Sequence, residues 1–393
     1  MNIIFIGQIY FDGQLEYFKS KGSNIDVAAH TFQSVLLDGI KLHSHTVHII
    51  STPYVSCYPK TKLLRIQGQD FSDGSGLKYS IPFLNISGIK HLTKIFYIRR
   101  KLKKLLSEGK EYRIIVYGIH SPFLLSLIGL NRHHRHKTCL VVPDLPEYMS
   151  EKGNPIYKIA KKIDRKFINI GLKDIDSYAL FSNLMTERIA INKPYIVIEG
   201  IYKDDGNNSS TPKANNKIIL YSGNLDARYG ILMLIEAFSS INDNNFRLWI
   251  CGNGNSIKQI QEYANNDNRI TYWGVLPREK VLEMQRQATI LVNPRKSSET
   301  YTRYSFPSKT MEYLASGTPT IMSHLASIPP EYDSHIYYID QEDAEGLKKK
   351  IIEVASQSQD ELNDFGARAR EFILTTKNSY KQAGKLLSLL ETL

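Results

Sequence analysis

Cysteine is scarce in this chain of 393 residues: only Cys57, Cys139 and Cys251 are present, far apart in the sequence. An odd and dispersed set predicts neither a disulfide framework nor a zinc site built on cysteine. Long apolar runs are missing as well. The longest, IHSPFLLSLIGL (119–130), has about half the length that a membrane-spanning helix needs, and Ser and Pro interrupt it. The sequence therefore predicts no transmembrane segment.

A secretory signal is also missing. The first residues, MNIIFIGQ, have no basic stretch and no cleavage-site pattern, and they predict a buried strand instead. We therefore expect a cytoplasmic protein. A charged fraction of 23% and a hydrophobic fraction of 42% are typical of folded soluble domains. The length predicts two or three such domains.

Positive charge is unevenly distributed along the chain, whose net charge is +11. Residues 1–200 contain 28 Lys and Arg against 16 Asp and Glu, whereas residues 201–393 contain 22 against 23. Residues 91–173 alone hold 18 basic and 6 acidic side chains. The excess belongs to one region, which indicates an anionic partner there.

Short apolar runs alternate with segments of helical period, which predicts parallel sheets with crossover helices, the α/β class. Residues 202–217 are rich in Gly, Asn and Ser and predict a linker or exposed loop. We expect strands at 2–7, 45–51, 113–119, 137–142, 177–182, 217–223, 246–252, 269–274, 288–294, 318–322 and 335–340, and late helices at 343–357, 360–376 and 380–393.

The simplest architecture for this pattern is two doubly wound, Rossmann-like domains that face a central cleft. Ligands of such sheets bind beyond the carboxyl ends of the strands. We expect a first domain over 1–200, a linker over 201–215 and a second domain over 216–375. A last helix over 376–393 is a candidate to pack back on the first domain.

The segment FPSKTMEYLASGTPTI (306–321) predicts a helix that could bind an anion. Pro307 suits the first helical position, Gly317 suits the end, and a strand follows at once. The backbone amides near Ser308 and Lys309 would gather positive potential at the helix N-terminus. Glu312 follows on the first turns, and its carboxylate could accept hydrogen bonds from ribose hydroxyls. An ordinary helix with a solvated Glu and Lys is the alternative.

Two glycine-bearing turns follow expected strands of the second half. In YSGNLDARYGI (221–231), Gly223 permits close backbone approach, while Asn224 and Arg228 could reach a phosphate. In CGNGNS (251–256), Gly252 and Gly254 stand between strand and helix. The second turn lacks the third glycine of a dinucleotide fingerprint, so alone it is a weak signal.

These segments, together with ITYWGVLPREKV and ILVNPR, form an ordered set that resembles the donor-binding half of the GT-B glycosyltransferases of family 4. That family includes bacterial polysaccharide-assembly enzymes. The resemblance covers nearly the whole second half. It implies a nucleotide-diphosphate sugar as donor, ribose bound by Glu312 and diphosphate bound near Ser308 and Lys309. Arg295, at the end of ILVNPR, joins the donor-binding candidates. No cofactor and no metal are implied.

The sequence departs from the family pattern at two places. Tyr304 stands where the family commonly has a second glutamate, so Glu299, Arg303 or Tyr304 itself would have to contact the donor sugar. Asn224 and Tyr229 replace the usual Arg and Lys of the first turn. Arg228 is then the cation left within reach of the phosphates.

The first half resembles the family less closely. The resemblance nominates His120, after the expected strand at 113–119, for a place near the transferring sugar. A histidine satisfied by its neighbours is the alternative.

Asp144 and Glu147 follow the next strand and could contact the acceptor or act as base, although loop carboxylates are commonly just solvated. Gly22 and Ser23 lie in a turn that the family places against the donor phosphate. Asn24 is the expected N-cap of the following helix.

The histidines of NRHHRH, namely His133, His134 and His136, indicate a solvated basic connector rather than a metal site, because they are too close in sequence to share one regular helical face with other ligands.

Two basic segments, 94–110 and 154–171, have helical apolar stripes that predict core packing. The stripes are Ile95, Ile98, Leu102, Leu105 and Leu106, and Ile156, Ile159, Ile163, Phe167 and Ile170. The clustered cations in 94–173 indicate docking on an anionic membrane surface. Nucleic acid is disfavoured, because no recognition motif accompanies the charge.

The sequence thus predicts a retaining, metal-independent glycosyltransferase, peripheral on the inner face of the plasma membrane. It would move a sugar to a glycan or lipid-linked acceptor of capsule, exopolysaccharide or O-antigen. Helix N-termini with Arg228 or Lys309 would stabilise the departing diphosphate, and His120 and Asp144 are the other catalytic candidates. A nucleotide-sugar epimerase of the same architecture and a non-catalytic GT-B partner protein are the alternatives.

Overall fold

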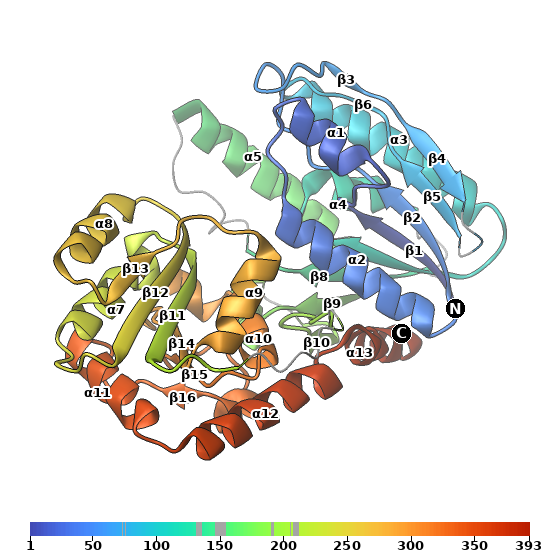
Figure 1. Ribbon diagram of the computed structural model, residues 1–393. Helices are drawn as coiled ribbons and strands as arrows, with labels where there is room; N and C mark the ends of the chain where they lie inside the picture. The colour runs from blue at the N-terminus through green and yellow to red at the C-terminus, as the bar shows by residue number, and fades with distance from the viewer. Residues whose placement is uncertain are drawn as a thin grey trace. The chain divides into compact units, whose positions relative to one another are not determined.

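The computed structural model describes residues 1–72, 74, 76–130, 136–145, 155–189, 192–204, 206 and 212–393. The chain divides into two compact units. Residues 1–201 with 379–393 form the first unit, and residues 202–378 form the second. Figure 1 shows a central sheet with helices packed against it in each unit.

The main sheet of the first unit has the order β10-β9-β8-β7-β1-β2-β5-β4. All neighbouring strands run parallel except β4 and β5, which are antiparallel. The strands are β1 (Asn2–Gly7), β2 (Thr46–Ser51), β4 (Gln69–Ser72), β5 (Leu77–Ser80), β7 (Tyr112–Tyr117), β8 (Lys137–Val142), β9 (Ser177–Leu180) and β10 (Tyr195–Val197). A small antiparallel pair, β3 (Arg65–Ile66) and β6 (Phe83–Leu84), lies apart from it.

The helices of the first unit include a close pair, α2 and α13, which pack against each other although they are far apart in sequence (Figure 1). A Cβ atom on Gly39 of α2 would meet the carbonyl oxygen of Ser379 at 2.2 Å, so only glycine allows this approach. The helices are α1 (Gln14–Ser20), α2 (Val27–Leu42), α3 (Ile89–Leu106), α4 (Ser121–Leu127), α5 (Pro155–Gly171), α6 (Thr186–Ile189) and α13 (Ser379–Glu391), with 3-10 turns at Leu172–Asp174 and Asn183–Met185.

The sheet of the second unit is parallel throughout, in the order β13-β12-β11-β14-β15-β16. Its strands are β11 (Lys217–Asn224), β12 (Phe246–Asn253), β13 (Ile270–Tyr272), β14 (Ile290–Asn293), β15 (Thr320–Met322) and β16 (Tyr337–Tyr338). Its helices are α7 (Ile231–Ser239), α8 (Ile257–Asn266), α9 (Arg278–Gln287), α10 (Ser308–Ala315), α11 (Ala344–Ala355) and α12 (Gln359–Thr376), with 3-10 turns at Ala227–Tyr229, Thr300–Arg303 and Pro330–His335.

Strand β11 shows why both faces of this sheet are covered. Ile219 and Tyr221 belong to the core that α7 and α11 complete. Ile218 and Leu220 point to the opposite face, into a core that includes Met284 of α9 and Tyr313 of α10. Alternate residues of a strand face opposite sides, so an unbroken apolar run predicts a strand buried on both faces.

The predicted α/β class and doubly wound fold are confirmed, and each of the eleven predicted strands is present. Five described strands, β3, β4, β5, β6 and β10, were not predicted. They are short, and β4 has the polar sequence QDFS, which carries no apolar alternation. The predicted N-cap Asn24 is wrong. Helix α2 begins two residues later than predicted, with Asp26 as its N-cap, and the Asp26 carboxylate accepts a hydrogen bond from the Ala29 amide at 3.0 Å.

The predicted core packing of the two basic helices is right for one and wrong for the other. In α3, Ile98, Leu102 and Leu105 are buried. In α5, the stripe residues Ile159, Ile163, Phe167 and Ile170 are 45–60% exposed. Helical period reveals an apolar face but not whether another element covers it.

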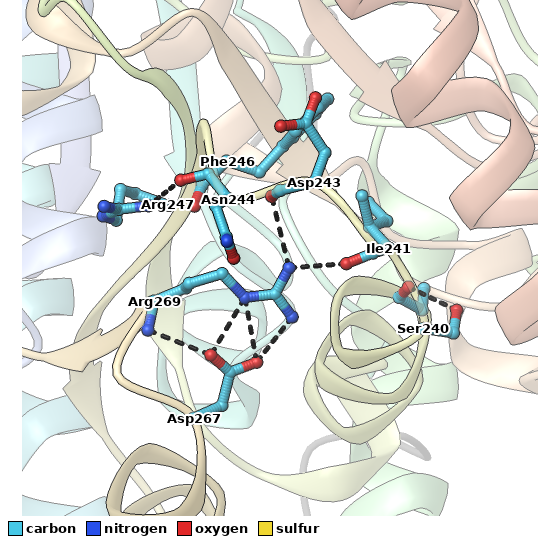
Figure 2. Close-up of polar contacts among 9 residues, drawn as sticks. Ser240, Ile241, Asp243, Asn244, Phe246, Arg247, Asp267 and Arg269 are labelled. Carbon is cyan, nitrogen blue, oxygen red and sulfur yellow. Dashed lines mark hydrogen bonds and ion pairs between the residues drawn. The ribbon is translucent and has the colours of Figure 1, made fainter.

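An ion pair braces the amino end of the second sheet (Figure 2). The Arg269 guanidinium binds both oxygens of Asp267, with its shortest N···O distance at 2.7 Å, and donates to the backbone carbonyls of Ile241 and Asp243. Hydrogen bonds from Arg269 hold the pKa of Asp267 below its usual range. A hollow of about 680 Å³ lies beside this brace, at the end of the sheet away from the carboxyl ends of the strands.

Replacing Arg269 by Met should lower the free energy of unfolding of the second unit by about 2 kcal/mol, because a half-buried carboxylate and two carbonyls lose their donor. Both tryptophans, Trp249 and Trp273, lie in this unit, so their fluorescence in urea reports its unfolding. Since the folded pKa of Asp267 is depressed, the difference should be complete at neutral pH and shrink as the pH falls below about 4. The exposed Lys258→Met serves as control, and equal midpoints for Arg269→Met and wild type would contradict the brace.

Candidate functional site

Helix α10 is fixed to the carboxyl end of the second sheet through one tyrosine. The Tyr313 hydroxyl accepts a hydrogen bond from the Ser222 amide at 2.8 Å and lies 3.1 Å from the Ser222 carbonyl oxygen. Ser222 is near the end of β11. Because Tyr313 is buried, this hydrogen bond fixes the position of α10 against the end of β11.

The N-terminus of α10 is open. Pro307 is the N-cap residue rather than the first helical residue, and no side chain caps the helix. The Thr310 amide bonds to the Pro307 carbonyl, and the amides of Ser308 and Lys309 precede it in the first turn. Uncapped amides at a helix start attract anions through hydrogen bonding and the helix dipole.

Glu312 is held from three sides. Its Oε1 accepts hydrogen bonds from Lys309 Nζ at 2.7 Å and from Gln285 Nε2 at 2.8 Å. Its Oε2 lies 3.9 Å from Arg278, a longer contact that leaves room for other donors. The Glu312 side chain is only 18% exposed.

Opposing effects set the ionisation state of the Glu312 carboxyl group. Burial favours the neutral acid, but Lys309, the Gln285 amide and Arg278 together outweigh it and hold the pKa of Glu312 below its usual range. The carboxylate is therefore ionised at neutral pH and can accept hydrogen bonds from a diol.

The two predicted glycine turns lie side by side, because β11 and β12 pair with Gly223 opposite Gly252 and Asn224 opposite Asn253. Gly252 has φ +140°, and a Cβ there would meet the Gly223 carbonyl oxygen at 1.8 Å. A Cβ on Gly254 would meet the Leu225 carbonyl carbon at 2.4 Å. These two glycines are thus required by packing between the turns, whatever else approaches them.

Two predicted cations lie beside these turns, on a pair of aromatic side chains formed by Tyr229 and Tyr301. Arg295 and Arg228 both lie over the Tyr229 ring, at 4.7 and 4.9 Å from its centroid. Tyr301 packs edge-on against Tyr229 and its hydroxyl donates to the Arg228 carbonyl at 3.2 Å. Arg228 is well exposed and 4.0 Å from Asp226, so it remains accessible to a ligand.

Apart from Asn224, the other donor-site candidates of the second unit lie on or next to the turn Thr300–Arg303 and helix α10. Glu299 is the N-cap residue of that turn. Tyr304, which stands in place of the family's glutamate, is buried with 5% exposure. Arg303 and Ser308 are exposed, and Asn224 ends β11 with an exposed side chain.

In the first unit, His120 follows β7 and is the N-cap residue of α4. Its ring packs edge-on against Phe123 with centroids 5.4 Å apart, and within the described residues it makes no hydrogen bond. Burial, followed by the charge of Lys94, lowers the pKa of His120 to about 4. The imidazole is neutral at pH 7 and free to accept a proton or a hydrogen bond.

The remaining candidates of the first unit differ in availability. Asp144 follows β8 and is exposed. Gly22 has φ +78°, whereas the buried Ser23 hydroxyl bonds to the Asn24 carbonyl and the Ser56 amide, so its donor is used internally.

The predicted solvated connector of histidines is wrong at His136. This side chain is buried, and its ring nitrogen accepts a hydrogen bond from the Tyr112 amide. Glu147, His133 and His134 lie outside the described residues.

Sequence reasoning missed two residues that hold Glu312 in place, Gln285 and Arg278 of α9. Gln285 is fully buried, and its amide nitrogen also donates to Ser222 Oγ at 3.1 Å. A glutamine on the buried face of a helix was the available signal, but its partner is distant in sequence. Across the described ranges, no group of three His, Cys, Asp or Glu side chains is placed to hold a metal ion.

Comparison with known proteins relates this geometry to a family. Residues 203–372 match the model of the family described as glycosyl transferases group 1. No curated protein matches the chain by sequence. Solved structures match over the whole chain at low identity, which shows that the fold is that of GT-B glycosyltransferases.

Three of these structures illustrate the likeness. Sucrose-phosphate synthase from Thermosynechococcus elongatus has a TM-score of 0.66 and 15% identity, covering 100% of this chain and 99% of that one. A TarM mutant of S. aureus, in complex with fondaparinux, alpha-GlcNAc-glycerol and UDP, has a TM-score of 0.63 and 12% identity, covering 99% and 100%. WaaG, a glycosyltransferase involved in lipopolysaccharide biosynthesis, has a TM-score of 0.60 and 13% identity, covering 99% of both chains.

Lys309→Met should raise the pKa of Glu312, because burial then acts on a carboxylate that has lost its nearest cation. Carbon-13 NMR titration of selectively labelled glutamate carboxyls measures this pKa. Lys280→Met, which removes the exposed partner of Glu283 on α9, is the matched control and should leave Glu312 unchanged. An unaltered Glu312 titration in Lys309→Met would show that other groups set its charge.

Proposed function

We propose that the protein is a retaining glycosyltransferase that moves a sugar from a nucleotide-diphosphate sugar to a glycan or lipid-linked acceptor in the assembly of a surface polysaccharide. The open N-terminus of α10 with the braced carboxylate of Glu312 is the observation that carries this proposal. The family match over 203–372 supports it, as does the similarity to the structure of TarM in complex with UDP. The role of WaaG in lipopolysaccharide biosynthesis supports the cellular context.

In this proposal the amides of Ser308 and Lys309 bind the diphosphate and Glu312 binds the ribose hydroxyls. The leaving diphosphate gains negative charge as the sugar departs, so preorganised amides and cations accelerate transfer without a metal ion. Arg228 and Arg295, stacked on Tyr229, are the candidate cations beside the glycine turns. His120 and Asp144 remain candidates for the transfer step itself.

The donor is tested by a thermal-shift screen against UDP-, GDP-, ADP- and CDP-sugars. A ligand at 100 times its dissociation constant should stabilise the protein by about 2.7 kcal/mol. Glu312→Ala should weaken the best ligand by about tenfold to a hundredfold, because hydrogen bonds to a charged acceptor contribute about 1.5–3 kcal/mol. Glu283→Ala, a carboxylate of the neighbouring helix α9, is the control.

Turnover separates the alternatives. Release of nucleoside diphosphate that depends on an added acceptor and is lost in Glu312→Ala supports the transferase. Interconversion of two nucleotide-sugars without acceptor would replace it by an epimerase. A chain that binds none of the four donor classes would be a non-catalytic partner protein, and the proposal would be wrong.

We also propose that the first unit docks on an anionic membrane surface through α3 and α5. Residues Ile159, Ile163 and Phe167 of α5 expose an apolar face with five cations around it, and Leu92 and Phe96 of α3 are exposed as well. An amphipathic helix with these features binds lipid interfaces through burial of its apolar face and attraction of its cations. None of the described helices is both long and apolar enough to cross a membrane.

The double variant Ile163→Ser/Phe167→Ser should weaken binding to vesicles containing phosphatidylserine by at least about tenfold, because burying one large apolar side chain contributes about 1.5–3 kcal/mol. Vesicle co-sedimentation measures this binding, which should also weaken as salt rises. Ile352→Ser, an exposed apolar residue of α11, is the control. Equal sedimentation of wild type and double variant would assign α5 another partner.

A further inference from the structure

Asparagine side chains line the hollow of about 680 Å³ at the amino end of the second sheet. Two lie on the turn between α7 and β12, two end helix α8, and one lies on the turn before β13. They are Asn242, Asn244, Asn265, Asn266 and Asn268. All are exposed, and in the described part of the chain none of these side chains has a hydrogen-bond partner. Each amide thus keeps its donors and acceptors for a ligand.

Turn geometry does not account for these asparagines. Asparagine favours turns because it tolerates a left-handed backbone and because its side chain can bond to the backbone two residues on. Ser44 is the one described residue other than glycine with a positive φ, so neither turn needs the first property. The second property is supplied by Asp243 and Asp267, which accept from backbone amides two residues on at 2.8 and 3.0 Å. The free amides therefore call for a different explanation.

The ion pair of Arg269 and Asp267 holds the two turns together. Arg269 donates to the carbonyls of Ile241 and Asp243 before β12, and to both carboxylate oxygens of Asp267 before β13 (Figure 2). The Asp267 amide in turn bonds to the Tyr263 carbonyl of α8 at 2.9 Å. The backbone around the asparagines is therefore fixed in the absence of a ligand, so binding requires little ordering of the turns.

The chemistry of this wall excludes most classes of ligand. Among the described lining residues, Arg269 is the one cation and Asp267 the one carboxylate, and they bind each other rather than an anion or a metal ion. No described apolar side chain lines the hollow, whereas a protein interface has an apolar core. A neutral ligand with many hydroxyl groups fits, because each hydroxyl can accept from an asparagine NH₂ group and donate to an asparagine oxygen.

We infer that this hollow binds a neutral stretch of a glycan chain. Its volume lies within the range of about 300–1,000 Å³ that is typical of ligand sites. The candidate donor site is at the carboxyl ends of the same strands, so the glycan is bound away from the transfer step. The choice of a glycan among hydroxyl-rich ligands rests on the proposed function, because a polysaccharide-assembling transferase meets such a chain as acceptor or product.

Native gels that contain dextran, mannan or galactan test the inference. The intact chain is run toward the cathode, because its net charge is +11. At least one of these neutral polysaccharides should retard the wild type relative to a gel without polysaccharide. The double variant Asn244→Ala/Asn266→Ala should lose about tenfold in affinity, because hydrogen bonds from two amides are removed. Alanine leaves the net charge unchanged, so mobility in the plain gel should stay the same.

A second pair and a matched control separate binding from folding. Asn265→Ala/Asn268→Ala should lose retardation like the first pair. Gln359→Ala/Asn363→Ala, which removes two exposed amides of α12, should be retarded like the wild type. Both asparagine pairs should unfold at the urea concentration of the wild type, followed by tryptophan fluorescence, because the replaced side chains are exposed.

The inference is overturned if none of the three polysaccharides retards the wild type, or if both asparagine pairs are retarded as strongly as the wild type. Retardation that requires Ca²⁺ and is lost in EDTA would assign the asparagine oxygens to a metal ion and would also overturn it.

Nucleotide-sugar binding is measured by thermal shift on the same wild-type preparation, which separates this inference from the proposed function. A chain that binds a polysaccharide through the hollow but binds no nucleotide-sugar keeps the glycan site and loses the proposed function. Nucleotide-sugar binding without retardation in any gel defeats the glycan site alone.

Discussion

The hydrogen bond between the Tyr313 hydroxyl and the Ser222 amide is the contact on which the candidate donor site depends. It joins the middle of helix α10 to the end of strand β11, and thereby sets the open first turn of the helix beside the glycine turns. Gln285 extends the same network by donating to Ser222 Oγ and to Glu312. Because these groups are buried, the positions of the helix tip and of the carboxylate are fixed before any ligand binds, which lowers the ordering cost of binding.

A buried charged side chain of the second unit and one of the first unit differ in their partners. Glu312 is surrounded by Lys309, Gln285 and Arg278, so it stays ionised despite burial. Lys94 has Thr52 and an aromatic ring but no counter-ion among the described residues. In our account the first arrangement holds a carboxylate ready for hydroxyl groups. Both arrangements lie at carboxyl ends of parallel strands, where the fold leaves space for ligands.

Much of the fold could be predicted from local pattern. Apolar runs such as KIILYSG give strands because both faces of a parallel sheet are buried, and Gly317, with φ +74°, ends α10 where it was expected to. The details that failed depend on tertiary neighbours. Asn24 and Asp26 are equally good capping residues by type, and in the folded chain it is the Asp26 carboxylate that accepts from the Ala29 amide. The apolar face of α5 has the same period as a core helix, although its stripe is exposed.

The site was predictable only in part for the same reason. Glu312 and the helix tip stand in one continuous segment, whereas Gln285 reaches Glu312 from a different helix, 27 residues earlier. Tyr229 stands where the family commonly has a lysine, and the sequence does not reveal that the guanidinium groups of Arg228 and Arg295 lie over its ring. Lys90 and Lys94 of α3 are cations in an apolar row of the sequence, and only the structure shows that both are buried.

A crystal structure with a bound nucleotide-sugar tests the central claim most directly. The account predicts diphosphate oxygens within hydrogen-bond distance of the Ser308 and Lys309 amides, and the ribose hydroxyls on Glu312 Oε2. A nucleotide bound elsewhere, with Glu312 contacted only by Lys309, Gln285 and Arg278, would contradict it.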